Sequence, residues 1–222
     1  IVTIWAVATI TFFLMNLVPG GPFLSEKAIS PQATAALEAK YGLDKPLFQQ
    51  YLTYITDALH GDFGDSLKQR GRTVMDIIKM KFPVSARVGG VSVLVSLILG
   101  VPLGCIAALK RGKFADSLIS VVATCGIAVP SFVICTLLLY FFGVKLQILP
   151  TMGLTTAKHY VMPVMALAFY PTAYIMRLMR SSMLDVLGQD YMRTAKAKGL
   201  AGGKILFKHA LRNAILPVIT YV

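Results

Sequence analysis

The chain has 222 residues, of which 56% are hydrophobic and 14% are charged, and its formal net charge is +12. Soluble domains carry about a quarter charged residues, so this composition excludes an ordinary soluble domain and indicates an integral membrane protein. The positive charge is divided among several loops, which argues against a nucleic-acid-binding surface.

Four segments are long and apolar enough to cross a bilayer, which requires roughly 20 apolar residues in a helix. They cover residues 1–18, 88–109, 118–144 and 160–176, and a fifth apolar segment begins near Ala214. The first has no basic leader before it and no Ala-x-Ala site after it, so we expect a span whose beginning is missing, not a signal peptide. Prolines are expected to kink the third and fourth segments: Pro130, Pro163 and Pro171.

Lysine and arginine predict the orientation of these segments, because basic loops remain in the cytoplasm. Basic residues cluster at 110–113 and again between Arg177 and Arg212, whereas basic and acidic residues nearly balance in 19–87. We therefore expect a cytoplasmic N-terminus followed by a first, truncated span over 1–18. Residues 19–87 then form an extracytoplasmic helical loop, and residues 88–222 a transmembrane domain with a cytoplasmic loop over 177–213.

The outer loop carries two helical patterns. Ser30-Pro31 begins the first, over residues 32–41, and Gly42 ends it. The second, over residues 46–60, places an apolar stripe on one face and ends at Gly61: Leu47, Tyr51, Ile55 and Leu59. This stripe can contact a partner protein or pack on the membrane spans, and the pattern does not decide between them.

The predicted spans 88–109, 118–144 and 160–176 contain no ionisable side chain. Ion-coupled carriers usually keep such a residue at membrane depth, and an intramembrane hydrolase needs a nucleophile with a partner there. The three cysteines lie inside apolar runs without metal-ligand spacing: Cys105, Cys125 and Cys135. We therefore expect no catalytic site, no metal site and no cofactor in this chain.

A basic amphipathic segment over residues 190–213 separates the last two apolar segments. Its first half ends at Gly199, where a glycine C-cap is expected. The second half restarts at Lys204 with apolar residues mostly on one side: Ile205, Leu206, Phe207, Ala210 and Leu211. The stretch 199–204 lacks the spacing of a phosphate-binding loop. The segment is either a helix lying on the anionic membrane surface or a docking element for a cytoplasmic partner.

The glycine-centred segment, followed by Leu216-Pro217, resembles the coupling loop of ABC importer permeases, often called the EAA loop. Its sequence, RTAKAKGL…HALRNAILP, is most similar to that of the permeases in the peptide and nickel branch of that superfamily. Arg193, Thr194 and Ala195 stand where the general pattern has Glu-Ala-Ala, a departure usual in the peptide branch. Other motifs of the branch follow along the chain: VPGGP at 18–22, YGLDKP at 41–46, QY at 50–51, GDFGDS at 61–66, GVPLG at 100–104 and VPSF at 129–132.

The resemblance implies an all-α integral membrane protein with the type I ABC importer permease fold, here about four spans and the start of a fifth from a six-span subunit. The implied partners are a second homologous permease, two ABC ATPases that bind ATP and Mg²⁺, an extracytoplasmic solute-binding protein, and inner-membrane lipid. Import of di- or oligopeptides is the expected function. The alternatives are a nickel or other small-solute permease of the same family, and a non-transport scaffold with a lipid-binding basic hairpin.

Two groups of site residues follow from the resemblance. The ATPase-coupling group comprises Arg193, Thr194, Ala195, Lys196, Ala197, Gly199, Leu200, His209, Leu216 and Pro217. The group that faces the binding protein comprises Tyr41, Gly42, Leu43, Tyr51, Asp62 and Asp65.

Overall fold

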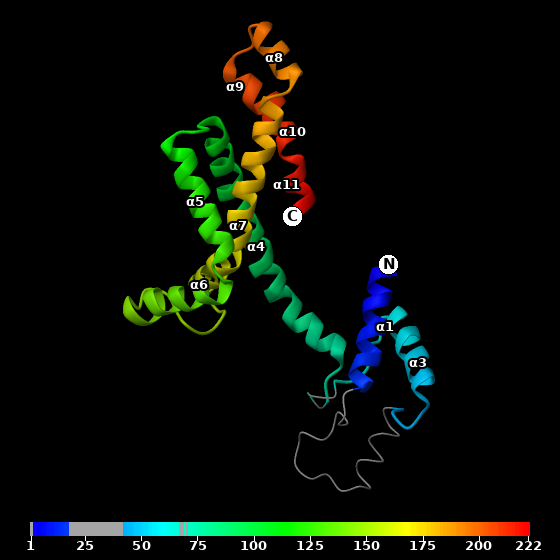
Figure 1. Cartoon of the computed structure of the whole chain (residues 1–222). Helices are drawn as coiled ribbons and strands as arrows, with labels where there is room; N and C mark the ends of the chain where they lie inside the picture. Colours follow the sequence, from blue (N-terminus) through cyan, green and yellow to red (C-terminus); the bar gives the residue numbers. More distant parts are fainter. Residues whose placement is uncertain (1, 18–41, 67–68, 70) are drawn as a thin grey trace. The chain divides into compact units, whose positions relative to one another are not determined.

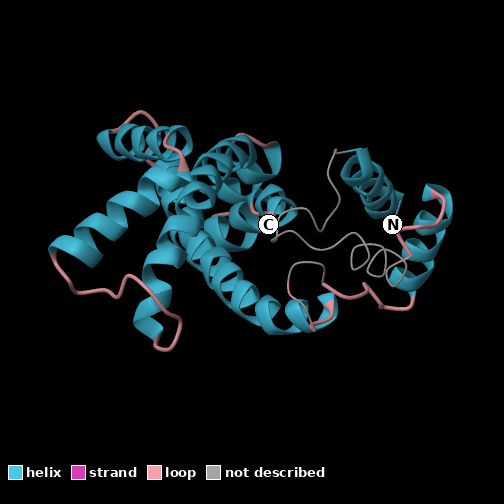
Figure 2. Cartoon of the chain, turned by 90° about the horizontal axis from the view of Figure 1, so that it is seen from below, coloured by secondary structure: helices cyan, strands magenta, loops and turns pink. Residues whose placement is uncertain are grey.

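The computed structural model describes residues 2–17, 42–66, 69 and 71–222 of the chain. These residues form helices joined by loops, and the only strand-like pairing within them is an isolated bridge between Asp65 and Thr73 (Figure 1, Figure 2). The chain divides into two compact units, Ile1–Pro83 and Val84–Val222. The helical architecture agrees with the predicted all-α class. The predicted helix over 32–41, the motif at 18–22 and Tyr41 lie outside the described residues.

In the first unit, α3 (Leu47–Leu59) packs against α1 (Val2–Leu17) through a single buried side chain. The centroid of the Tyr51 ring lies 5.5 Å from that of Phe12 and 5.4 Å from that of Phe13. The Tyr51 hydroxyl is 2.8 Å from Thr9 Oγ1, within hydrogen-bond distance. At Tyr51 the predicted stripe therefore packs on an apolar helix, which is one of the two outcomes that the sequence left open.

The turn before α3 is held by the helix itself. Gly42 has a φ of +66°, in the left-handed region that favours glycine. The Gln50 side chain donates to the carbonyl oxygens of Leu43 at 3.1 Å and Lys45 at 2.8 Å. Because these contacts join residues within one short stretch, residues 42–46 and Gln50 together form one local structure.

Helix α4 (Val74–Leu109) has 36 residues and begins earlier than the predicted second span. The Asp76 amide donates to Thr73 Oγ1 at 3.1 Å, and the Asp76 carboxylate accepts from the Thr73 amide at 3.4 Å. This reciprocal pair is a capping box with Asp in the place usually held by Glu, and it satisfies two amides at the helix start. Residues 74–87 of the predicted outer loop are thus helical and continuous with the predicted span.

In the second unit, the predicted third span is not one helix. α5 (Phe114–Ala128) and the combined segment α6 (Ser131–Leu138) with η1 (Leu139–Lys145) are bent by 99° where they meet. Val129, before Pro130, has an extended ψ of 122°, and Pro130 has no amide hydrogen to continue the helical pattern. The helix therefore breaks at Pro130, where a kink was predicted, and the bent pair is either one broken span over 118–144 or a re-entrant loop.

The predicted fourth span is the middle of a longer helix, α7 (Ala157–Leu187), which begins at a capping box of Thr156 and His159. α7 runs unbroken through Pro163 and Pro171, and a kink at either proline stays a prediction. Residues 177–187, predicted as the start of the coupling loop, belong to this helix. They continue it because Met179 and Met183 keep a buried face beyond the predicted membrane boundary.

Helices α4 and α7 approach each other along small residues spaced four apart on α4: Ser92, Ser96, Gly100, Gly104 and Ala108. A Cβ atom on Gly100 would lie 2.7 Å from Ile175 Cγ2, and one on Gly104 would lie 2.6 Å from Met179 Cβ. The Ser96 hydroxyl donates to the Ala168 carbonyl at 3.2 Å. Small residues at this spacing let helix backbones come close in a membrane. The stripe therefore sets the position of α7 against α4.

Among the described residues, α4 and α7 are each long and apolar enough to cross a membrane. The bent pair of α5 with α6 and η1 counts as a third if it forms one span, and α1 is a shorter apolar helix. These helices agree with an integral membrane protein. The number of spans, four and the start of a fifth, stays a prediction.

Candidate functional site

The polar segment after α7 folds back on itself, and we name residues 188–215 the hairpin. Its elements are α8 (Asp190–Ala197), α9 (Gly202–Lys204), η2 (Ile205–Leu211) and α10 (Arg212–Ala214), and α11 (Leu216–Tyr221) follows it. Figure 1 shows α8 and α9 beyond the end of α7, with α10 and α11 returning along α7. The helix predicted to restart at Lys204 is present: α9, η2 and α10 follow one another without a break from Gly202 to Ala214, with a π-helical stretch in the middle.

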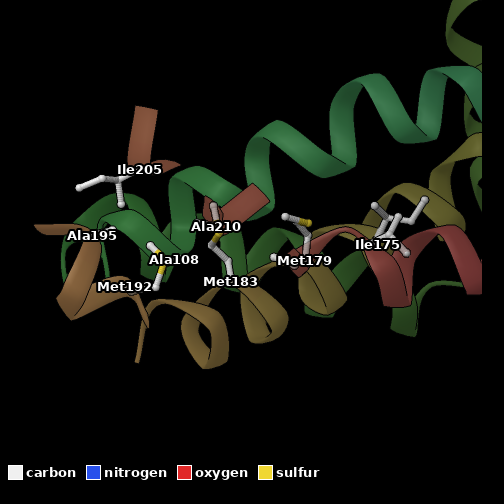
Figure 3. Packing of buried hydrophobic residues seen from close by; sticks show 10 residues of the cluster. Ala108, Ile175, Met179, Met183, Met192, Ala195, Ile205 and Ala210 are labelled. Carbon is white, nitrogen blue, oxygen red and sulfur yellow. The ribbon is translucent and has the colours of Figure 1, made fainter. Parts of the chain in front are cut away.

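A core of large apolar side chains joins the hairpin to α7 (Figure 3). Met179 and Met183 of α7 and Met192 of α8 are each 0% exposed. Small and branched residues complete the cluster: Ala108, Ile175, Ala195, Ile205, Ala210, Ala214 and Val218. Burying one methionine side chain stabilises a structure by about 1.5–3 kcal/mol. The hairpin is therefore packed on the end of α7 as a unit and is not a free amphipathic segment.

Gly199 ends α8 in a complete Schellman motif. Its φ is +70°, its amide donates to the Lys196 carbonyl at 2.9 Å, and the Leu200 amide donates to the Ala195 carbonyl at 3.4 Å. No atom lies within 4 Å of the position that a Cβ on Gly199 would occupy. The backbone turn therefore explains the glycine within this chain, and the space beside it is open.

The residues of the predicted coupling group lie on both sides of α8. Arg193, Thr194, Lys196 and Ala197 are exposed, as is Gly199. Ala195 is 7% exposed and belongs to the hairpin core, so its side chain faces inward, and its contact with a partner stays a prediction. Leu200 is half-buried against the same core. The exposed side of α8 is thus mainly basic, and Tyr191 is also 41% exposed on it.

The basic side chains on this surface have almost no acidic partners. The one ion pair among the described hairpin residues joins Arg193 Nη1 and Asp190 Oδ1 at 3.5 Å, and both side chains are exposed. Such surface pairs contribute about 0–1 kcal/mol. Further cations lie in the second limb of the hairpin, residues 202–214, after the first limb formed by α8: Lys204, Lys208 and Arg212. The hairpin therefore offers a positive surface to an acidic partner.

The second limb contains a stretch of π-helix, and this changes which residues are buried. η2 forms hydrogen bonds between residues five apart, and Ile205 and Ala210, five apart, are both buried. Phe207 is 68% exposed, so the prediction that it shares the apolar side is wrong. Even in a regular α-helix Phe207 would lie about 200° around the axis from Ile205, so the prediction grouped residues that do not share one face.

Polar contacts tie the two limbs together near the exit of the hairpin. The Asn213 side-chain amide donates to the Tyr191 hydroxyl at 3.0 Å and to the His209 carbonyl at 3.3 Å. Leu216 and Pro217 form the exposed first turn of α11, where a proline costs no helical hydrogen bond. His209 and Leu216-Pro217 thus lie where the chain turns back toward α7.

The group predicted to face a binding protein is only partly exposed in the first unit. Asp62 is exposed, and its carboxylate accepts from the Gly64 amide at 2.8 Å in a local turn. Asp65 is exposed and pairs through its backbone with Thr73. Gly42 and Leu43 are half-buried, and Tyr51 is buried against α1. That this group faces a partner stays a prediction, and the Tyr51 side chain itself packs on α1.

The sequence prediction missed an ion pair at the start of α5. Arg180 of α7 donates to Asp116 Oδ1 through Nε at 2.5 Å and to Oδ2 through Nη2 at 2.8 Å. Asp116 also accepts from the Gly112 amide at 2.9 Å and from the Ser120 hydroxyl at 3.4 Å. The available signal was a lone carboxylate next to a basic turn, but its partner lies 64 residues away.

Within the described residues, no three His, Cys, Asp or Glu side chains come close enough together to hold a metal ion. The cysteines are free thiols, with Cys105 half-buried and Cys125 and Cys135 exposed. The polar features of the described chain are thus the hairpin surface and the ion pair between α5 and α7.

Two protein-family models match this chain, one in each half. Residues 100–222 match the family described as binding-protein-dependent transport system inner membrane component. Residues 1–89 match the N-terminal family of the same membrane components. The two matches together cover both structural units.

Individual relatives match over nearly the full chain. The dipeptide transport system permease protein DppB of Bacillus subtilis is 46% identical over 218 residues, which are 98% of this chain and 71% of that protein. The oligopeptide transport system permease protein OppB of Salmonella typhimurium is 42% identical over 222 residues, 99% of this chain and 72% of that protein. A dipeptide permease, DppB of Lactococcus lactis, is 37% identical and is covered to 73%.

Proposed function

Since this chain belongs to the family of binding-protein-dependent transport system inner membrane components, we propose that it is the transmembrane permease subunit of an ATP-driven importer of short peptides. The observation that carries the proposal is the identity of 46% and 42% to a dipeptide and an oligopeptide permease over nearly the whole chain. The non-transport scaffold loses its support, because both units match transport components.

The hairpin is the part of the subunit that binds an ATPase partner. Its exposed face, with Arg193, Thr194, Lys196, Ala197 and Gly199, meets a groove on the ATPase, and the absence of a side chain at Gly199 allows close approach. Ala195 and Leu200 shape this face from inside the hairpin core. The buried methionines support the proposal, because a packed hairpin can transmit a displacement to α7.

The complete importer contains further subunits. A second homologous permease completes the translocation path, and two ATPase subunits bind ATP and Mg²⁺. An extracytoplasmic solute-binding protein delivers the peptide, and Gly42, Leu43, Asp62 and Asp65 face it, whereas the buried Tyr51 supports that face from behind. The N-terminus and the hairpin lie in the cytoplasm, as the basic residues of the hairpin suggest. This chain holds no nucleotide, and ATP hydrolysis belongs to its partners.

Gly199→Asp tests the docking role in cells that express the full importer from a deletion background. Asp tolerates the left-handed region better than most residues, so the Schellman turn persists while a carboxylate enters the basic open face. We expect insertion in the membrane to be retained and uptake of a labelled dipeptide to fall to that of the deletion strain. Gly203→Asp is the matched control, because Gly203 is also open to solvent and has no left-handed φ.

The outcomes separate the substrate from the coupling mechanism. Normal peptide uptake by Gly199→Asp would contradict the docking role, and equal loss with Gly203→Asp would show that any added acid in the hairpin is harmful. Nickel uptake is measured in parallel in the deletion strain. Loss of nickel uptake without loss of peptide uptake would move the proposal to the metal-transporting alternative.

A further inference from the structure

Asp116 is the only charged residue that is buried among the described residues, at 5% exposed. Its carboxylate receives two hydrogen bonds from the Arg180 guanidinium, whose side chain is 32% exposed. A bidentate pair of this kind fixes both the distance and the relative orientation of its partners. The pair therefore restrains how α5 and α7 can turn against each other.

The contact also reaches the turn between α4 and α5. Gly112 has a φ of +75°, and its amide donates to Asp116 Oδ2 at 2.9 Å. One carboxylate thus joins that turn, the first turn of α5 and, through Arg180, the second half of α7. Among the described residues, it makes the only side-chain hydrogen bonds between α5 and α7.

The packing beside the pair is incomplete. Farther along the same interface, Ala123, Ala173 and Met176 form a small apolar cluster, and a Cβ on Gly126 would lie 2.6 Å from Ala173 Cβ. Between this close contact and the ion pair is an open cavity of about 290 Å³, and its lining is part apolar and part polar, the polar residues being Ser120, Thr124, Arg177, Arg180 and Ser181. At this end of the interface, Ile119 still packs on the apolar cluster, and the ion pair adds the only side-chain hydrogen bonds between these two helices among the described residues.

Arg180 lies within the part of α7 that carries the hairpin. Met179 precedes it in sequence, Met183 follows one turn later, and both belong to the hairpin core. Any displacement of the hairpin that turns or tilts the end of α7 must therefore move the Arg180 backbone as well.

We propose that the Asp116–Arg180 pair is a positioning contact that makes α5 move as one body with α7 and the hairpin. The inference rests on the proposed function, since it needs an ATPase partner that moves the hairpin. Without the pair, the cavity leaves room for α5 to stay in place when α7 moves. The ATPase subunits then continue to hydrolyse ATP while less peptide is transported. A purely structural role predicts instead that uptake and hydrolysis fall together.

The first test compares peptide uptake and ATP hydrolysis by the complete importer in proteoliposomes. In Asp116→Asn the carboxamide keeps the size of the side chain and an acceptor for Gly112, but it loses the charge that pairs with Arg180. We expect uptake to fall about tenfold while hydrolysis stays within about twofold, as for loss of a coupling contact. Arg180→Lys keeps the charge without the bidentate geometry and should give an intermediate ratio of uptake to hydrolysis.

The control is Arg177→Gln, which removes an exposed charge from the same helix and the same cavity without touching the pair. We expect it to keep the wild-type ratio. An unchanged ratio in Asp116→Asn would overturn the inference. Failure of both Asp116→Asn and Arg180→Lys to assemble would also overturn it, since the pair would then be a requirement for folding.

The second test measures the motion directly and does not depend on the substrate. With the native cysteines replaced, spin labels on Val121→Cys in α5 and Asp185→Cys in α7 report their distance in the complete importer, without nucleotide and with trapped ATP. We expect one distance in both states for the wild type and a shift between states for Asp116→Asn. Equal behaviour of the two would refute the inference, whereas absent peptide uptake with the expected distances would refute only the proposed substrate.

Discussion

Met183 is the residue on which the junction of α7 and the hairpin depends most clearly. It is 0% exposed, and it lies beyond Met176, the last residue of the predicted fourth span. We expect water to surround this end of α7, and the hydrophobic effect to act on Met183 as in a soluble domain. Its neighbours in the core come from both limbs of the hairpin, for example Met192 and Ala210.

We predict that Met183→Ala destabilises the subunit by about 2–5 kcal/mol, because the truncation leaves a cavity in a fully buried cluster. The readout is the thermal unfolding temperature of the purified complex in detergent. Phe207→Ala is the control: this side chain is 68% exposed, and its loss should change stability by about 0.5 kcal/mol or less. Similar losses for both variants would show that the hairpin core is not packed as described.

The small residues of α4 act at the scale of the element. In a bilayer the apolar driving force between helices is weak, so close backbone contact and packing hold α4 against α7. Gly104 lies at the tightest point, since an added Cβ would also lie 2.7 Å from the Met176 carbonyl oxygen. A backbone oxygen cannot move aside as a flexible side chain can.

We predict that Gly104→Ala separates α4 from α7 locally and lowers stability by about 1–3 kcal/mol, as overpacking does in other interiors. Gly90→Ala is the matched control on the same helix, because nothing lies within 4 Å of its Cβ position. There, alanine is expected to be neutral or to stabilise the helix by up to about 1 kcal/mol. Detergent unfolding of the two variants side by side distinguishes them, and an undisturbed Gly104→Ala protein would exclude the tight contact.

At the scale of the whole molecule, the positive charge is unevenly distributed along the chain. The net charge of +12 is concentrated in a few segments, among them the hairpin and the turn after α4. The basic residues of those segments predict that both lie in the cytoplasm, since cytoplasmic loops retain lysine and arginine. An opposite orientation would present the hairpin to the exterior, where no ATPase is present.

Single cysteines test this orientation in a protein without Cys105, Cys125 and Cys135. In right-side-out vesicles, we expect a membrane-impermeant maleimide to label Asp62→Cys and not Lys198→Cys. Inside-out vesicles should give the reverse, because both positions are exposed in their own units. Labelling of Lys198→Cys from the outside would contradict the proposed topology and with it the docking role of the hairpin.

Much of the local structure could be predicted from neighbouring residues. Gly199 was expected to end a helix and does so, because a left-handed C-cap depends on a few adjacent backbone groups. The stripe of α3 was predicted with its helix for the same reason. The start of α4 was missed, although Thr73 and Asp76 carry a recognisable capping signal. The prediction took the length of the apolar run, which gives the extent of a membrane span but not of the longer helix that contains it.

By itself, the sequence determined that this is a membrane protein of helices with a polar, glycine-capped hairpin, since composition, periodicity and caps act over a few residues. Only the tertiary structure decided which residues of that hairpin face inward. Ala195 is buried because α8 packs its Met192 and Ala195 side on the end of α7, and Phe207 is exposed because it lies on the side of its helix opposite Ile205. The Asp116–Arg180 pair likewise joins residues far apart in the chain. It exists because α5 and α7 lie side by side, and no local pattern in either helix specifies the other.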